Sequence, residues 1–412
     1  MTEASYGALL RVPSLARALA GMQIARIAQS MVGLALVLFT LAHYHSPELA
    51  GLVTSAGIAP GLAVSPIAGA LLDRHGRTRL ITLDFLIASA SLALIGALAL
   101  ADALPAWLLI AIAAVSALTG PLSATGLRSL FPLMAPRHLW ERVNAVDSNG
   151  WVVATLVGPP IAAVVVSIIG GPWALIVLGG AYAIAAAIVI GVPDPPTAPS
   201  TSGRLLVDAW QGVRYTWRNP TLRGLGFSIT TLNIAGGIST IAIPLIVLNR
   251  LQLGQAAVGL VFAVQGLFGL FAGLLAGRMD TRGRERPLIV WPMLGFGFGT
   301  ALLLPDAGII PVVAAMAVVG LVNGPMDVAM FTVRQRRTDP AWMGRAFAVS
   351  MSFNFAGYPI GSAIGGILAG QSISLAIGVA VVACVAAFVI AWRLIPATGA
   401  EPGGAAAPAP ET

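Results

Sequence analysis

Long apolar segments alternate with short polar ones along nearly the whole chain. A helix needs about 20 apolar residues to cross the ~30 Å hydrocarbon layer of a bilayer. Spans of that length are predicted at residues 17–42, 49–71, 79–101, 105–130, 143–168, 172–192, 223–249, 255–276, 287–304, 309–333, 344–369 and 372–394. The pattern therefore predicts an all-α membrane protein with twelve transmembrane helices.

The composition supports this prediction, because 57% of the 412 residues are hydrophobic and only 9% are charged, with a mean hydropathy of +0.89. Such a chain has too little polar surface to cover a water-soluble globule. The single Cys384 excludes a disulfide framework. The formal net charge of +7 comes from arginines in short turns. Membrane topology explains that charge better than a nucleic-acid partner, and none is expected.

Arginines fall almost entirely in alternate polar loops. These loops hold Arg74 to Arg79, Arg137 and Arg142, Arg204 to Arg223, Arg278 to Arg286, and Arg334 to Arg345, whereas the opposite loops contain only Arg250. Positively charged loops stay on the cytoplasmic side of a membrane. The asymmetry predicts a multi-pass protein of a bacterial inner membrane with both termini in the cytoplasm.

The polar stretches also predict the domain organisation. The expected parts are a cytoplasmic N-terminal segment (1–15), a six-helix bundle (16–193), a cytoplasmic linker (194–222), a second six-helix bundle (223–395) and a disordered cytoplasmic tail (396–412). Within the linker, Leu206, Trp210, Val213 and Trp217 recur at helical spacing. They predict an amphipathic helix along the inner membrane face, which is either a simple tether or a regulatory element.

Two polar turns, at residues 69–79 and 276–286, share a spacing of acid, glycine and arginine. The first carries Gly69, Asp73, Arg74, Gly76, Arg77 and Arg79, and the second carries Asp280, Arg282, Gly283 and Arg284, with Ala276 and Thr281 as departures. Farther along, Gly120, Pro121 and Arg142 are echoed by Gly324, Pro325 and Arg345. The repeat predicts two pseudo-symmetric six-helix bundles.

With these motifs the chain resembles the major facilitator superfamily over about residues 10 to 395, because the turn at 69–79 matches the motif A of that family. The resemblance implies the fold of that superfamily and a latch that holds the two halves together in the outward-facing state. Asp73 would accept hydrogen bonds at a helix N-terminus across the domain boundary, held by Arg74 and Arg77. Alternatively, the arginines only set the topology and solvate the turn.

A stretch of small residues lies in the fifth predicted helix, at Gly150, Ala154, Gly158 and Pro159. It is similar to motif C, which exporters of the superfamily carry. Small residues at this spacing allow close contact between helices, and proline bends the helix. The alternative is the ordinary packing of small residues between membrane helices.

Few charges lie inside the spans, where an unpaired charge costs ~3 kcal/mol or more. In the first helix Arg26 shares a polar face with Gln23, Gln29 and Ser30. We expect this face, together with Asn323, to line a substrate cavity. Alternatively, Arg26 extends toward the cytoplasm or pairs with a neighbouring carboxylate.

Three acids inside the spans are candidates for proton coupling: Asp327, Asp147 and Asp84, in that order. Asp327 ranks first because it follows Asn323 on a helix that lines the cavity in the superfamily, and burial penalises the charged form of a carboxyl group. The alternatives are structural ion pairs, of Asp84 with Arg77 or Arg79 and of Asp147 with Arg142 or Arg128. The fourth helix lacks the internal arginine of motif B, so Arg26 is the candidate for that missing cation.

No catalytic constellation, metal site or cofactor-binding motif is found, because the four histidines are scattered and no phosphate-binding glycine loop occurs. An enzyme is therefore not expected. The sequence predicts a secondary active transporter, expected as a monomer, that exports an amphipathic or hydrophobic small molecule (a drug-like compound or a metabolite) by proton antiport. Alternatives are an uptake symporter or facilitator, a lipid or lysolipid flippase, and a nontransporting membrane receptor.

Overall fold

The computed structural model describes residues 6–194, 205–279, 282–339 and 342–397, and these are helical apart from short connections. The first half contains α1 (Tyr6–Leu10), α2 (Leu15–Tyr44), α3 (Pro47–Ala56), α4 (Ala59–His75), α5 (Arg77–Leu100), α6 (Ala106–Met134), η1 (Arg137–Leu139), α7 (Trp140–Ile169) and α8 (Gly171–Val189). The second contains α9 (Leu205–Arg218), α10 (Pro220–Leu245), η2 (Ile246–Arg250), α11 (Gln255–Ala276), α12 (Glu285–Ala301), α13 (Ile309–Arg336), α14 (Met343–Phe355), α15 (Gly357–Gln371) and α16 (Ile373–Leu394).

Among the described residues, ten helical segments are long and apolar enough to cross a membrane. The other two predicted spans correspond to α12, which has 17 residues, and to α14 with α15, which are separated at Ala356. A similar break divides the second span into α3 and α4, where Pro60 lies in the first turn of α4. Proline is tolerated in a first turn because its missing N–H has no partner to lose there. The predicted all-α membrane fold is thus confirmed.

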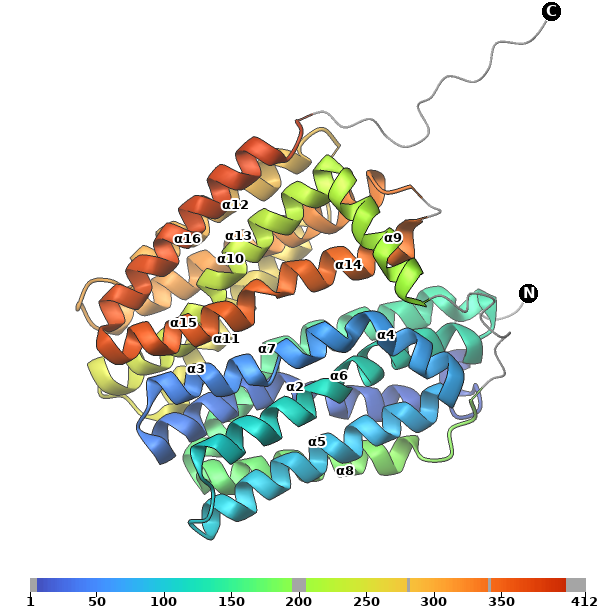
Figure 1. The fold of residues 1–412 in the computed structure, drawn as a ribbon, viewed down its shortest axis with the longest axis horizontal. Coiled ribbons are helices and arrows are strands. Elements are labelled where there is room, and N and C mark those ends of the chain that lie inside the picture. Colours follow the sequence, from blue (N-terminus) through green and yellow to red (C-terminus); the bar gives the residue numbers. More distant parts are fainter. Residues whose placement is uncertain (1–5, 195–204, 280–281, 340–341, 398–412) are drawn as a thin grey trace, which may run out of the picture.

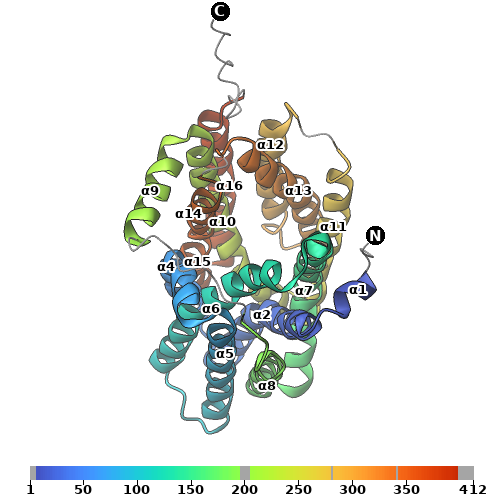
Figure 2. The ribbon, with the colours of Figure 1, turned by 90° about the vertical axis from the view of Figure 1, so that its right-hand side faces the viewer.

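The helices form two bundles that lie side by side, with the chain passing from the first to the second between α8 and α9 (Figure 1). Helices α1 and α9 and the C-terminal end of α16 lie toward one end of the bundles, and α3 and α15 lie toward the other. Viewed from the end with α9, the helices are seen nearly end-on (Figure 2). We call these the terminal end and the far end.

At the far end the two halves are packed backbone to backbone. A Cβ atom on Gly51 of α3 would lie 2.9 Å from the Cα of Gly366 of α15. A second contact joins α7 and α11, where a Cβ on Gly259 would lie 3.1 Å from the Cα of Pro160. At the terminal end, α4 contacts α14 and α9 much less extensively. The halves are therefore held most tightly at the far end.

Candidate functional site

An ion pair joins α2 and α7 inside the first half. Nη2 of Arg26 bonds to Oδ1 of Asp147, and Nη1 donates to the Asp147 carbonyl oxygen at 2.7 Å. From α6, Nε of Arg128 lies 3.7 Å from the other carboxylate oxygen. The side chain of Arg26 is 8% exposed and that of Asp147 is 15% exposed. The structure therefore brings a predicted cavity residue and a predicted proton-coupling residue together.

Neighbouring side chains extend this contact along the two helices. Nε2 of Gln23 donates to the carbonyl oxygen of Gly150 at 3.0 Å, and the Arg26 guanidinium lies 5.7 Å from the ring centroid of Trp151. Ser30 packs against Gly158, where an added Cβ would lie 2.5 Å from the Ser30 Cβ. Together, these contacts make one face of α2 the polar seam with α7.

The predicted polar face of α2 is divided in the structure. Gln23, Arg26 and Ser30 face α7, whereas the side chain of Gln29 is exposed. One turn farther along, nothing lies within 4 Å of the position that a Cβ on Gly33 would take. Of the four predicted lining residues on this helix, Gln29 is thus the one beside open space.

Glycines and alanine of the motif C-like stretch lie against α2 rather than across the boundary. Gly150 and Gly158 contact Gln23 and Ser30, and Ala154 between them is fully buried. The prolines that follow do not end α7, and Pro160 meets Gly259 of the second half. The sequence pattern predicts a single small-residue face. In the structure, Gly150 and Gly158 pack within the first half, whereas Pro160 packs across the boundary at the far end.

Asp327 lies in the second half, on α13. Its Oδ2 atom accepts a hydrogen bond from Nδ2 of Asn323 at 3.0 Å, one turn earlier on the helix. Among the described residues, Asp327 makes no ion pair. The two leading proton-coupling candidates thus differ, because Asp147 lies between two arginines and Asp327 has a neutral amide partner.

Asp84 of α5 is buried in the first half. Its carboxyl group interacts with the hydroxyl groups of Thr119 and Ser123 on α6. In the described part of the chain it forms no ion pair. Its predicted alternative partners lie elsewhere, since Nε of Arg77 donates to Oγ of Ser129 at 3.0 Å and Arg79 is exposed.

The first motif A turn is closed by an acid that the sequence interpretation missed. Between α4 and α5, Gly76 has a φ of 88°, where a side chain would be strained. Oδ2 of Asp194, which follows α8, accepts from the backbone N–H of Thr78 at 3.2 Å. A carboxylate is stabilised at a helix N-terminus, here that of α5. Arg74 is exposed, and the surroundings of Gly69 and the side chain of Asp73 lie outside the described part.

In the second motif A turn, Asp280 lies outside the described residues, and Arg282, Gly283 and Arg284 are exposed. One residue later, Glu285 is buried and forms an ion pair with Arg336. This pair joins the start of α12 to the end of α13. Arg77 and Ser129 join the start of α5 to the end of α6 in the same way.

Arg334 is a buried charge that the sequence placed in a cytoplasmic loop. Instead, α13 continues past it, and its side chain has no exposure. Nη1 lies 2.7 Å from the sulfur of Met351, and the amide oxygen of Asn354 lies 2.6 Å from Nη2. Rings of Phe331 and Phe347 cover it at 5.8 and 5.2 Å. A seven-residue spacing from Asp327, which puts both on one helix face, could have indicated it.

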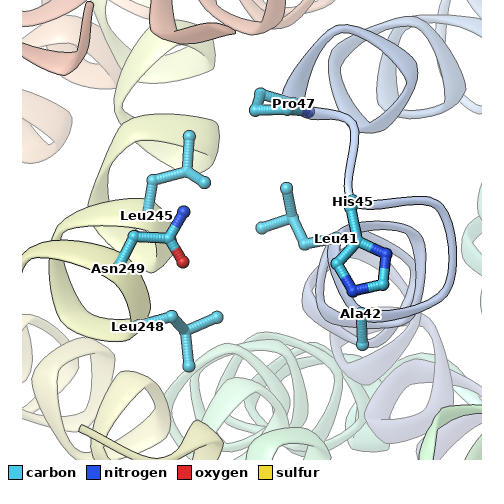
Figure 3. A pocket seen from close by; sticks show the side chains of 7 residues that line it. All are labelled: Leu41, Ala42, His45, Pro47, Leu245, Leu248 and Asn249. Carbon is cyan, nitrogen blue, oxygen red and sulfur yellow. The ribbon is translucent and has the colours of Figure 1, made fainter. Parts of the chain in front are cut away.

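At the far end, a cavity of about 210 Å³ lies between α2 and the end of α10 (Figure 3). It is lined by Leu41, Ala42, His45, Pro47, Leu245, Leu248 and Asn249. The two halves contribute opposite walls, with His45 and Asn249 as the polar groups. None of the predicted site residues lies in it, so it is separate from the Arg26–Asp147 region.

The profile of the Major Facilitator Superfamily matches residues 18–233 and 225–410 of this chain. The chain belongs to the Major Facilitator Superfamily. It is similar to the "uncharacterized MFS-type transporter y4rN" of Sinorhizobium fredii, with 37% identity over 90% of this chain and 92% of that protein. It also resembles the "multidrug efflux pump Tap" of Mycolicibacterium fortuitum (27% identity, 82% and 85% covered) and "macrolide efflux protein A" of Streptococcus pyogenes (20%, 83% and 86%).

Solved structures of transporters share the fold. The crystal structure of the nucleoside transporter NupG matches with a TM-score of 0.72 and 10% identity, over 92% of this chain and 97% of that one. A bacterial homologue of the iron transporter ferroportin, in its inward-facing state, matches with a TM-score of 0.71 and 14% identity over 94% and 99%. The chain is therefore a multi-pass membrane transporter of this superfamily, and its relatives and structural neighbours are transporters.

Proposed function

We propose that this superfamily member exports an amphipathic or hydrophobic small molecule, a drug-like compound or a metabolite, in exchange for protons. The relatives named as multidrug and macrolide efflux proteins support export of such compounds. The observation that carries the proposal is the ion pair between the buried Arg26 and the partly buried Asp147, with Arg128 beside it. Charges this expensive to bury in a membrane helix are retained where they serve transport.

Proton exchange is proposed at the acids that the structure places inside the bundles. Protonating Asp147 would cost its ion pair with Arg26, whereas protonating Asp327 would cost no ion pair among the described residues. Asp327 is therefore the first candidate for the exchanging group and Asp147 the second. Asp84, whose carboxyl group interacts with two hydroxyl groups of α6, remains third.

Alternating access is proposed to occur by rocking the halves, 16–193 and 223–395, about a site between them. Tight packing of Gly51 on Gly366 at the far end, and the weaker contact of α4 with α14, support a state open toward the terminal end. With both termini in the cytoplasm of a bacterial inner membrane, this state would be inward-facing. The protein is proposed to act as a monomer.

A cross-link at the far end tests the rocking motion. Because Cys384 is the single cysteine and is buried, a Cys384→Ala background allows Glu48→Cys and Gly370→Cys, also at the far end, to be joined without competing thiols. The Glu48 carboxylate occupies the place that a Cβ on Gly370 would take, so cysteines at these two positions are within reach of a short thiol reagent. We expect oxidation to abolish transport and reduction to restore it. Full activity of the cross-linked protein would exclude opening at this contact.

The function is tested in proteoliposomes with an imposed pH gradient and a panel of amphipathic compounds. We expect gradient-driven movement of at least one compound out of the compartment that corresponds to the cytoplasm, and Asp327→Asn should lose both the drive and its pH dependence. Asp306→Asn makes the same change at an exposed acid before α13 and is the matched control, which should keep both. Accumulation in the opposite direction would indicate uptake, lipid movement alone a flippase, and an inert protein a receptor.

A further inference from the structure

Helix α9, between the two halves, has one face fixed to the protein. The ring of Tyr215 stacks on that of Trp342 with centroids 5.1 Å apart, and its hydroxyl accepts from the backbone N–H of Asp339 at 2.9 Å. Thr216 beside it is buried. This face therefore holds α9 to the connection between α13 and α14.

The opposite face of α9 is apolar, basic and exposed. Trp210, Val213 and Trp217 are 68%, 40% and 57% exposed, and their spacing puts them on one side of the helix. Arg214 and Arg218 flank them and are exposed as well. In the part of the chain that the structure describes, neither arginine forms an ion pair. We call these five residues the α9 stripe.

The place of α9 relates the stripe to the membrane surface. Seen nearly along the helices, α9 lies at the rim of the molecule, outside α10 and α14 (Figure 2). The Trp217 ring meets that of Phe227 at 5.6 Å, and Phe227 belongs to the candidate membrane span Pro220–Arg250. The stripe is thus at the level where α10 enters the bilayer, with Trp217 against α10 and most of the stripe's surface exposed.

We propose that the α9 stripe binds anionic phospholipid headgroups at the membrane surface. Tryptophan prefers the headgroup level of a bilayer, where its ring is apolar and its N–H stays hydrated. Arginine binds phosphate through two parallel hydrogen bonds, and basic residues beside an amphipathic helix add electrostatic attraction to anionic lipid. The combination of ring, cation and rim position matches a lipid surface better than a folded protein partner.

Fluorescence quenching of the full-length protein in liposomes tests this proposal without any transport measurement. Bromine is carried on the acyl chains of either phosphatidylglycerol or phosphatidylcholine. The signal from the stripe is the difference between the wild-type protein and Trp210→Phe/Trp217→Phe. We expect brominated phosphatidylglycerol to quench this signal more strongly at low salt than brominated phosphatidylcholine.

Removing the charges should remove this preference. In Arg214→Gln/Arg218→Gln we expect the relative binding constant for phosphatidylglycerol to fall about fivefold for each arginine. Arg393→Gln, an exposed arginine at the end of α16, makes the same change elsewhere and should leave the preference intact. Equal quenching by both lipids, or a preference that survives loss of both arginines, would overturn the proposal. Absence of quenching would do so too, because the stripe would then face water.

Discussion

The two halves make the same helix contact with different charges. The offset that aligns Asp73 with Asp280 also aligns Arg26 with Asn233. The offset that aligns Arg142 with Arg345 also aligns Asp147 with Ser350. In this register, the Arg26–Asp147 ion pair of the first half corresponds to an amide and a hydroxyl in the second. Nδ2 of Asn233 donates to a backbone carbonyl, that of Asn354, at 2.9 Å.

What the duplication preserves is the bond to the backbone. Nε2 of Gln23 donates to the carbonyl of Gly150, and at the corresponding place Oγ1 of Thr230 donates to that of Phe353 at 2.6 Å. Both bonds attach the first helix of a half to its fifth. Both halves keep the bond to the backbone, but only the first half has the ion pair. The ion pair is therefore not needed to pack these helices. This difference supports a functional role for the pair.

The largest expected loss of stability comes from replacing Asp147 and Arg26 with the residues at the corresponding places of the second half, serine and asparagine. Asp147→Ser alone leaves Arg26 as an unpaired buried charge, which should cost about 3–5 kcal/mol of stability. Arg26→Asn alone should cost less, because Arg128 stays beside Asp147. The double variant removes both charges and should regain most of the lost stability while transport stays absent. Thermal unfolding in detergent and proteoliposome transport measure the two quantities.

If the double variant were as unstable as the worse single variant, the pair would be structural, contrary to the comparison. Asn233→Ala/Ser350→Ala in the second half is the matched control. Because those side chains carry no charge, we expect the loss of the Asn233 hydrogen bond to lower the free energy of unfolding by about 1–2 kcal/mol at most.

A second pair of contacts compares the two motif A turns. Glu285→Gln keeps the shape but removes the charge facing Arg336, whose side chain is 28% exposed. We expect about 1–2 kcal/mol of destabilisation, between the values for surface and buried ion pairs. Ser129→Ala, which removes the oxygen that Arg77 binds in the first half, should cost about 1 kcal/mol. Equal losses in the two variants, measured by thermal unfolding, would show that charge adds nothing at this joint.

The apolar pattern predicted the fold because bilayer thickness imposes the same length on every span. Motif spacing also indicated the duplication and the chemistry of α2 and α7. Spacing does not reveal which side chains meet, since Arg26 and Asp147 are 121 positions apart. The contact of Asp194 with Thr78 likewise depends on where α8 ends beside α5. The sequence pattern predicts a loop at Arg334, because apolar periodicity locates helix ends poorly and one more helical turn decides between water and burial.

Arg334 supplies the smallest predicted effect and the sharpest contrast with Arg26. The offset that aligns Gly120 with Gly324 also aligns Leu130 with Arg334. Both of these side chains are fully buried. Its partners are neutral, so removing its charge relieves a desolvation cost while it leaves the amide of Asn354 without a donor. These two effects oppose one another. We therefore expect the free energy of unfolding of Arg334→Met to lie within about 1 kcal/mol of the wild-type value.

The matched variant Arg334→Lys keeps the charge but loses the planar group beside the stacked rings of Phe331 and Phe347. An ammonium ion is hydrated more strongly than a guanidinium, so burying it costs more free energy, and it lacks the planar shape of the group it replaces. The lysine variant should therefore be less stable than the methionine variant. Thermal unfolding in one detergent orders the three proteins. If methionine proved as damaging as Asp147→Ser, Arg334 would have an anionic partner. The contrast between a charged first half and a neutral contact in the second would then fail.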